Sequence, residues 1–307
     1  MKIVQLEYFC TVSQYHSITQ AAQKLYVTQP AISNAIRELE KEFSINLFSR
    51  NKNHLTLTRE GELFYKKARE LLDTIRQTSS QLYDLGKQVI PVKIGIPPLL
   101  STLFFPDMLL SFQEKYPDVP VELFEYGSIR AASLVQEDHL DLALVNMHFY
   151  DIDKMNSYRI LADHVVFCVS PGHHLAKEKE VSIEMLKDES LIMYNTDSVQ
   201  NATLSALFET AGIKPHIILH ASQLYTIQNF ISAGLGGACL YSSILPGCSE
   251  FIKLPITPLV RQDIGLVWKK GKYLNNSVEK FIAFTKKYPQ LKYLRTESMD
   301  AENVTKK

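Results

Sequence analysis

Cysteine, glycine and tryptophan are scarce in this chain, and its charges of the two signs balance. Its 307 residues include 4 Cys, 12 Gly and 1 Trp, and 33 Lys and Arg residues stand against 33 Asp and Glu residues. Scattered cysteines exclude a disulfide-rich secreted scaffold, and we interpret them as reduced core thiols. A formal net charge of zero excludes a protein that binds any polyanion through bulk charge alone.

Long apolar runs and redox motifs are missing as well. No apolar run approaches the length of a membrane span, and residues 1–7 lack the apolar core of a signal peptide. Cys239 and Cys248 are close in sequence. Neither has a neighbour of the kind that lowers a thiol pKa, so a redox switch is the weaker interpretation. These absences predict a cytoplasmic protein with no membrane partner.

Common catalytic motifs cannot be found either. The chain has no P-loop and no G-x-S-x-G, H-E-x-x-H or G-x-G-x-x-G motif, and its His, Asp and Ser residues form no visible triad. The adjacent pair His173-His174 follows Pro171-Gly172, which is typical of a solvated loop. We therefore predict that the chain is not an enzyme, and that it needs no metal and no cofactor.

The most informative segment spans residues 17–50 and is typical of two short helices joined by a tight turn. Ser17 can cap the first helix, and Gln20 stands where a capping box needs it. Four apolar residues then share one face of this helix, namely Ile18, Ala21, Ala22 and Leu25. After the break, Thr28 is placed to cap the second helix and Pro30 to lie in its first turn.

The second helix has an apolar face and a polar face. Its buried stripe is predicted to contain Ile32, Ile36, Leu39 and Phe43. Its polar face carries Gln29, Ser33, Asn34, Arg37 and Lys41. Such a helix can enter the major groove of DNA, where Gln and Asn match adenine and Arg matches guanine or a phosphate. The alternative is an ordinary amphipathic hairpin with a solvated polar face.

The flanking residues favour DNA binding. Leu6, Phe9 and Val12 indicate a preceding amphipathic helix, so that three helices can share one small core. Residues 50–58 are typical of a short β-wing, and they carry Arg50 and Lys52. A wing with cations beside such a helix fits phosphate contacts.

Together these motifs resemble the winged helix-turn-helix of LysR-type transcriptional regulators. The shared blocks are Ala21-Ala22 with Leu25, Val27-Thr28-Gln29-Pro30-Ala31-Ile32-Ser33, Ile36-Arg37-Glu38-Leu39-Glu40, Leu47-Phe48-Ser49-Arg50 and Leu57-Thr58-Arg59-Glu60-Gly61. Asn34 differs from the Arg of many family members. The resemblance implies double-stranded promoter DNA as a partner. We predict contacts at Ser17, Thr28, Gln29, Pro30, Ser33, Asn34, Arg37, Arg50, Lys52 and Thr58.

Residues 58–87 predict one long helix with a heptad seam. Apolar residues alternate at spacings of four and three, and the predicted dimer contacts are Phe64, Ala68, Leu71, Ile75 and Leu82. Such a helix would extend about 40 Å. The alternative is a single amphipathic helix packed on its own domain. The family resemblance also implies a dimerising linker helix, and it favours a tetramer over a dimer.

From residue 92 onward, predicted strands and helices alternate. Buried strands at 92–96, 142–145, 165–169 and 264–268 alternate with helices such as 99–116, 128–137, 199–211 and 277–288, which predicts doubly wound, largely parallel sheets. The expected domains are 1–58 for DNA binding, 59–90 for the linker and 91–295 for the effector. Lobe 1 takes 91–161 and 264–295, lobe 2 takes 162–263, and 296–307 is a polar, disordered tail.

This second half resembles the effector-binding half of LysR-type regulators, which is itself similar to periplasmic solute-binding proteins. The blocks include Ile94-Gly95-Ile96, Leu140-Asp141-Leu142-Ala143, Pro171-Gly172-His173-His174-Leu175 and Ala233-Gly234-Leu235-Gly236-Gly237. The resemblance implies a small-molecule effector between the lobes, with contacts predicted at Leu100, Ser101, Thr102, Ser128, Asn146, Thr196 and Ser198. The alternative for each polar residue is a turn or a helix cap.

The sequence therefore predicts an N-terminal winged helix-turn-helix, a long linker helix and a two-lobed α/β effector domain. Its predicted function is a ligand-responsive transcriptional regulator that binds promoter DNA as an oligomer and acts on RNA polymerase. The alternative is a solute-binding module without a regulatory role. DNA affinity that falls steeply with salt would separate the two.

Overall fold

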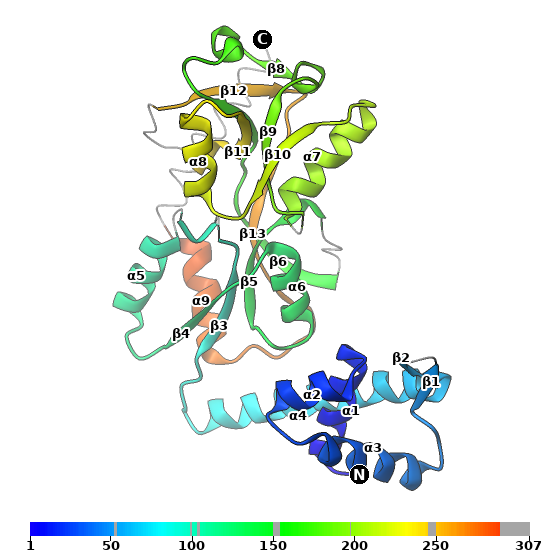
Figure 1. The fold of residues 1–307 in the computed structure, drawn as a ribbon. Coiled ribbons are helices and arrows are strands. Elements are labelled where there is room, and N and C mark those ends of the chain that lie inside the picture. The colour runs from blue at the N-terminus through cyan, green and yellow to red at the C-terminus, as the bar shows by residue number, and fades with distance from the viewer. Residues whose placement is uncertain are drawn as a thin grey trace. The chain divides into compact units, whose positions relative to one another are not determined.

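The computed structural model divides the chain into two compact units, Met1–Gly86 and Lys87–Lys307. We call them the head and the α/β unit (Figure 1). The structure describes residues 1–51, 54–98, 100–102, 105–149, 154–196, 198–244 and 250–288. Each unit is described by itself. The predicted tail at 296–307, together with Lys52 and Cys248, lies outside the described residues.

The head consists of four helices and a two-stranded wing. Its elements are α1 (Ile3–Tyr15), α2 (Ile18–Leu25), α3 (Gln29–Phe43), β1 (Phe48–Asn51), β2 (His54–Leu57) and α4 (Arg59–Leu85). The strands of the wing are antiparallel, with Phe48 opposite Leu57. The predicted helix-turn-helix and the wing are thus present. Phe43 is 43% exposed, so its prediction as a buried residue is wrong; Ala35 is buried instead.

The long helix α4 contributes its first half to the head's own core. Ala68 is 1% exposed and Leu72 is 4% exposed, and both pack with Phe9, Leu39 and Leu47. The prediction of Ala68 as a dimer contact is therefore wrong, because this side chain is already buried within its own chain. Phe64 packs against the same core, with its ring centroid 5.1 Å from that of Phe9.

Further along α4, apolar side chains remain in solvent. Leu71, Ile75, Leu82 and Leu85 are 45%, 36%, 61% and 79% exposed. Because these side chains are only partly covered by their own chain, α4 differs in its packing along its length. Ala68 and Leu72 hold α4 against the head, and an apolar strip from Leu71 to Leu85 remains exposed.

The α/β unit contains two sheets, which define its two lobes (Figure 1). Lobe 1 has the strand order β4-β3-β5-β13-β6, and lobe 2 has the order β10-β9-β11-β7-β12-β8. The strands of lobe 1 are β3 (Val92–Ile96), β4 (Val121–Glu125), β5 (Leu142–Asn146), β6 (Met155–Leu161) and β13 (Ile264–Lys269). Those of lobe 2 are β7 (Val165–Val169), β8 (Val181–Ser182), β9 (Ser190–Tyr194), β10 (His216–Ala221), β11 (Gly237–Tyr241) and β12 (Ile252–Thr257).

Helices cover both faces of each sheet. In lobe 1, α5 (Phe105–Lys115) and α9 (Asn276–Lys287) pack on one face and α6 (Ser128–Gln136) on the other. In lobe 2, α7 (Val199–Thr210) packs on one face and α8 (Leu224–Ser232) on the other. Short 3-10 turns are η1 (Leu100–Thr102), η2 (Met147–Phe149), η4 (His174–Lys177), η5 (Glu184–Leu186) and η6 (Ser242–Ile244).

Two segments connect the lobes, between β6 and β7 and between β12 and β13. They pair with each other, because Gln262 N donates to Asp163 O at 2.8 Å and His164 forms an isolated bridge with Arg261. The chain therefore changes sheet between Leu161 and Val165 and again between Thr257 and Ile264.

The sheets differ from the prediction in direction. Both are mixed: β13 runs antiparallel to β5 and β6, and β7 runs antiparallel to β11 and β12. The predicted helix at 99–116 is also wrong at its start, since η1 precedes α5, which begins at Phe105. In the described part of the chain no helix has both the length and the apolar character of a membrane span.

Candidate functional site

Helix α3 presents a polar face on the surface of the head. Gln29, Pro30, Asn34 and Arg37 are exposed, and Ser33 is half-buried. The opposite face is anchored by Ile32, Ala35, Ile36 and Leu39, which are buried in the head. Because these four residues anchor α3 in the head, its polar face is held toward solvent.

Acidic side chains of α3 are engaged within the head. Gln5 Nε2 donates to Glu38 Oε2 at 2.6 Å, and the N-terminal ammonium of Met1 lies 2.6 Å from Glu42 Oε2. Glu40 Oε1 accepts from Leu47 N at 2.8 Å. These contacts tie down three carboxylates, and Arg37 remains exposed on the polar face. A surface of this character is suited to a polyanion.

Two predicted DNA-contact residues have capping roles. Ser17 Oγ accepts from Gln20 N at 3.2 Å, which caps α2. Thr58 Oγ1 accepts from Gly61 N at 2.9 Å at the start of α4 and also donates to Asn46 O at 2.5 Å. Thr28 occupies the N-cap position of α3, but its hydroxyl makes no cap bond. The side chains of Arg50 and Lys52 lie outside the described residues.

Tyr26 is a surface feature that the sequence did not identify as functional. It lies in the turn between α2 and α3, with a left-handed backbone (φ 55°), and it is 96% exposed. The sequence around Tyr26 predicted a turn, but it did not indicate that the Tyr26 side chain would be exposed.

The α/β unit has a pocket between its two lobes. Its lining comes from the ends of strands and from helix N-termini on both sides: Pro97, Pro98, Leu100, Gly127, Ser128, Asn146, Tyr194, Asn195, Ser198, Val199, Gln200, Ser222 and Tyr241. The pocket is partly open to solvent, and its cavity volume is about 120 Å³.

A buried hydrogen-bond network joins the lobes at this pocket. Asn146 Nδ2, in lobe 1, donates to Tyr241 Oη of lobe 2 at 2.8 Å and also to Gln262 Oε1. Ser128 Oγ accepts from Asn146 N at 3.2 Å. The amide of Asn146 thus connects β5, β11 and the crossing segment that holds Gln262.

Two polar atoms of the lining have no partner. Tyr194 Oη and Gln200 Oε1 are buried and make no hydrogen bond, although Gln200 Nε2 donates to Cys239 O at 2.7 Å. An unsatisfied buried polar atom is costly, and functional sites are where such atoms are tolerated. Both atoms belong to residues that line the pocket.

Both pocket tyrosines remain protonated. Burial raises the pKa of Tyr194 well above its ordinary value, and burial also raises the pKa of Tyr241 even though Asn146 opposes this shift. Their hydroxyls can therefore donate as well as accept. Among the described residues that line the pocket, none is Asp, Glu, Lys, Arg or His.

Four of the predicted effector contacts line this pocket, namely Leu100, Ser128, Asn146 and Ser198. Ser101 and Thr196 are not among the lining residues; Ser101 Oγ donates to Pro98 O at 2.7 Å, and Thr196 is exposed. The side chain of Thr102 lies outside the described residues. Ser198 also caps α7, because its hydroxyl accepts from Asn201 N at 3.0 Å.

Apart from Ser198, the lining residues of lobe 2 were not predicted, chiefly Tyr194, Gln200, Ser222 and Tyr241. Tyr194 and Tyr241 end the strands β9 and β11. The carboxyl ends of strands are where α/β sheets place their ligands, so the position of each tyrosine after an apolar strand was the available indication.

Comparisons with known proteins assign both units. Residues 3–62 match the family model described as bacterial regulatory helix-turn-helix protein, lysR family, and residues 90–290 match the LysR substrate binding domain. A similar protein is the uncharacterized HTH-type transcriptional regulator YwbI of Bacillus subtilis, 35% identical over 94% of this chain and 97% of its own length. The HTH-type transcriptional regulator CysB of Haemophilus influenzae is 27% identical over 92% and 90%.

Solved structures share the fold. A full-length OxyR variant from Pseudomonas aeruginosa has a TM-score of 0.64 at 19% identity, covering 94% of this chain and 95% of its own. CbnR complexed with its target DNA has a TM-score of 0.56 at 18% identity, covering 93% and 99%. With a DNA-binding head and an effector-binding α/β unit both matched, this chain belongs to the LysR family of transcriptional regulators and is not an enzyme.

Proposed function

We propose that this regulator binds promoter DNA as an oligomer, with α3 in the major groove, and that an effector between the lobes changes how it holds the DNA. The observation that carries this proposal is the exposed polar face of α3 opposite a fully buried stripe. Gln29, Asn34 and Arg37 would meet base edges. Tyr26 and the wing would meet phosphates.

The test of the DNA face is Arg37→Ala. We expect it to weaken binding to a duplex selected from random sequence by the wild-type protein by about 1–3 kcal/mol, since a guanidinium contact to a base or phosphate is lost. The measurement is a fluorescence anisotropy titration at fixed salt. Lys214→Ala, which removes an exposed cation of the α/β unit, is the control and should leave the affinity unchanged. Equal affinities of Arg37→Ala and wild type would contradict the proposal.

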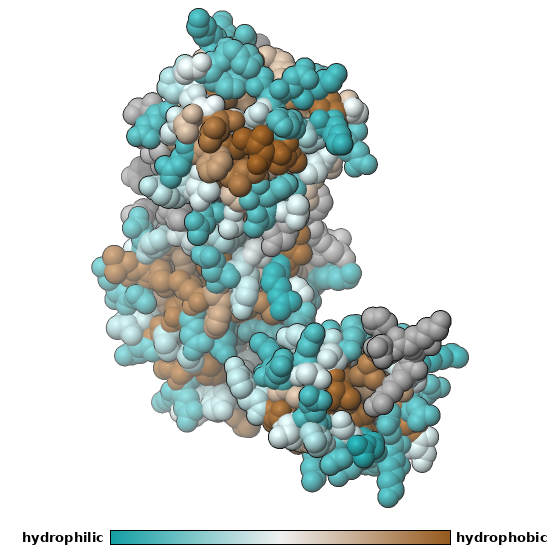
Figure 2. Space-filling model, in the orientation of Figure 1, coloured by the Kyte–Doolittle hydropathy of each residue, from teal (hydrophilic) through white to brown (hydrophobic). Residues whose placement is uncertain are grey.

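We propose that the second half of α4 forms the dimer contact. The exposed Leu71, Ile75 and Leu82 support it, because a dimer places two heads on two half-sites. A tetramer needs a second kind of interface. Apolar surface on the α/β unit could supply it (Figure 2), and the exposed Leu110 and Ile218 belong to this unit. A regulator of chromosomal genes would act in the cytoplasm, where this protein would change the recruitment of RNA polymerase.

We infer that the effector carries no net charge. The described pocket lining has no ionised side chain to balance a charge, and a buried charge without a partner is costly. The lining instead offers hydroxyls and the unpartnered Gln200 Oε1. The ligand that fits these groups is a compact molecule with uncharged hydrogen-bonding groups.

Matched pairs of metabolites test this ligand class. Each pair consists of a carboxylic acid and its amide or alcohol, and the measurement is the shift in thermal unfolding of the full chain. We expect the uncharged member to raise the unfolding temperature more, because it pays no cost for a buried charge. A consistent preference for the carboxylates would contradict the inference.

A further inference from the structure

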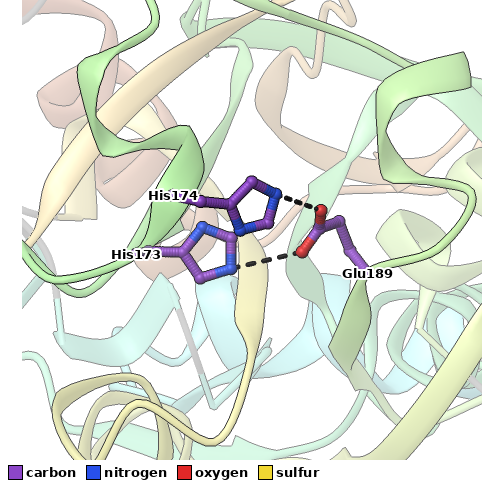
Figure 3. A group of neighbouring side chains, drawn as sticks. All are labelled: His173, His174 and Glu189. Carbon is purple, nitrogen blue, oxygen red and sulfur yellow. Dashed lines mark ion pairs between the residues drawn. The ribbon is translucent and has the colours of Figure 1, made fainter.

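Three side chains capable of ligating a metal meet in lobe 2, apart from the pocket lining: His173, His174 and Glu189 (Figure 3). His173 Nε2 lies 3.2 Å from Glu189 Oε2, and His174 Nε2 lies 2.9 Å from Glu189 Oε1. One ligand atom from each residue can be chosen so that all three lie within 4.8 Å of one another. The sequence predicted a solvated loop for the histidine pair, and this is wrong for His173, which is half-buried.

Two of the three side chains are nearly buried, and the third is exposed. The side chains of His173 and Glu189 are 14% and 11% exposed, whereas that of His174 is 68% exposed. The Glu189 carboxylate faces an imidazole with each of its two oxygens. A neutral imidazole supplies a hydrogen bond but no positive charge, so a nearly buried carboxylate is left without a full counter-charge. A cation at this point would provide it.

We propose that His173, His174 and Glu189 form a binding site for a divalent transition metal of the zinc class. Imidazole and carboxylate ligands suit such ions, and two histidines with one glutamate are an established zinc set that leaves a further position for water. The solvent-exposed His174 marks the side from which the ion enters. The bound ion would connect η4, where His174 lies, to Glu189, which directly precedes β9, the strand that ends at Tyr194.

Metal binding requires that both imidazole rings change their tautomer. His173 Nδ1 accepts from Leu175 N at 3.3 Å, so in the metal-free protein the proton of the neutral ring is on Nε2 and points toward Glu189. An ion on Nε2 requires that proton on Nδ1, and the contact with Leu175 is then lost. The proton of His174 shifts in the same way to Nδ1. Two N–H···O bonds are thereby exchanged for metal–ligand bonds, without net loss of a proton from the neutral rings.

The competing explanation is a purely structural clamp, in which two imidazoles hold Glu189 by hydrogen bonds. Both explanations predict that the three residues are in contact, so only metal binding separates them. The probes are Zn²⁺, followed by calorimetry, and Co²⁺, followed by its visible absorption. The protein is the full chain without a histidine tag, dialysed against a chelator beforehand.

We expect one ion per chain with an affinity in the micromolar range or tighter. His174→Ala and Glu189→Gln should each weaken this binding by about tenfold or more. The matched control is His139→Ala, which removes a histidine that is 52% exposed in lobe 1, and it should bind as wild type does. Because His174 is mostly exposed, His174→Ala decides the question even if Glu189→Gln fails to fold. Absence of saturable binding, or binding that His174→Ala leaves unchanged, would overturn the proposal.

Discussion

Two tyrosines of the pocket differ in a single hydrogen bond. Tyr241 Oη accepts from Asn146 Nδ2 at 2.8 Å, whereas Tyr194 Oη is buried with no partner. Removing the first hydroxyl breaks a bond and leaves an amide hydrogen unpaired. Removing the second costs the unliganded protein no bond and relieves an unsatisfied polar atom.

The two phenylalanine substitutions are therefore expected to act in opposite directions. Tyr241→Phe should lower the free energy of unfolding of the unliganded chain by about 1 kcal/mol, and Tyr194→Phe should leave it unchanged or raise it. Thermal and denaturant unfolding measure both. Tyr194→Phe should also weaken effector binding by roughly 1–1.5 kcal/mol. Loss of stability in Tyr194→Phe would mean that its hydroxyl already has a partner.

At this scale the sequence predicts local bonds better than distant ones. Ser17 caps α2 as expected, because the donor lies three residues away. Asn146 was expected near the effector and lines the pocket, but its bond to Tyr241 joins residues separated by 95 positions. The residues next to Asn146 and Tyr241 in the sequence do not indicate this hydrogen bond, because it depends on how the two lobes pack against each other.

Among the elements, α4 shows how one pattern can have two meanings. Spacings of three and four predicted a seam that includes Ala68, yet Ala68 and Leu72 pack one turn apart against the head's core. Adjacent stripes on a helix share this spacing. Only the position of the head decides which residues are buried, so the second half of the seam stays a prediction.

The docking of α4 requires a residue without a side chain at its start. A Cβ on Gly61 would lie 2.0 Å from Leu47 O. We expect Gly61→Ala to destabilise the head by about 1–3 kcal/mol, since α4 must shift away from the core. Calorimetric unfolding of the full chain measures this. Gly172→Ala, whose Cβ would meet nothing within 4 Å, is the matched control. Equal stability of Gly61→Ala and wild type would show that α4 can move without cost.

The strands differ in how clearly the sequence predicts them. β7 is buried along its whole length and was predicted with its observed bounds, Val165–Val169. β6 and β12 were not predicted, because buried and exposed residues are mixed along them. The mixed character of the sheets comes from β13 and β7, which run antiparallel to β5 and β11 and also to β6 and β12.

At the scale of the whole molecule, the proposed dimer can be tested without disturbing the fold. Leu71→Asp places a charge on a side chain that is 45% exposed, and we expect it to convert the dimer into monomers at micromolar concentration, because two carboxylates would face each other in the seam. Analytical ultracentrifugation measures this. Ser80→Asp adds the same charge on the opposite side of α4 and serves as the control. A dimer that survives Leu71→Asp would exclude this seam.

The division of labour along α4 also has a consequence inside a cell. A fragment that ends at Gly86 retains the core residues Ala68 and Leu72 together with the exposed strip from Leu71 to Leu82. With the proposed dimer contact along α4, it would pair with the intact protein, yet it lacks the effector-binding unit. Produced in excess, such a fragment would be dominant negative. Its mixed dimers with the intact protein would occupy the operators, and transcription would no longer respond to the effector.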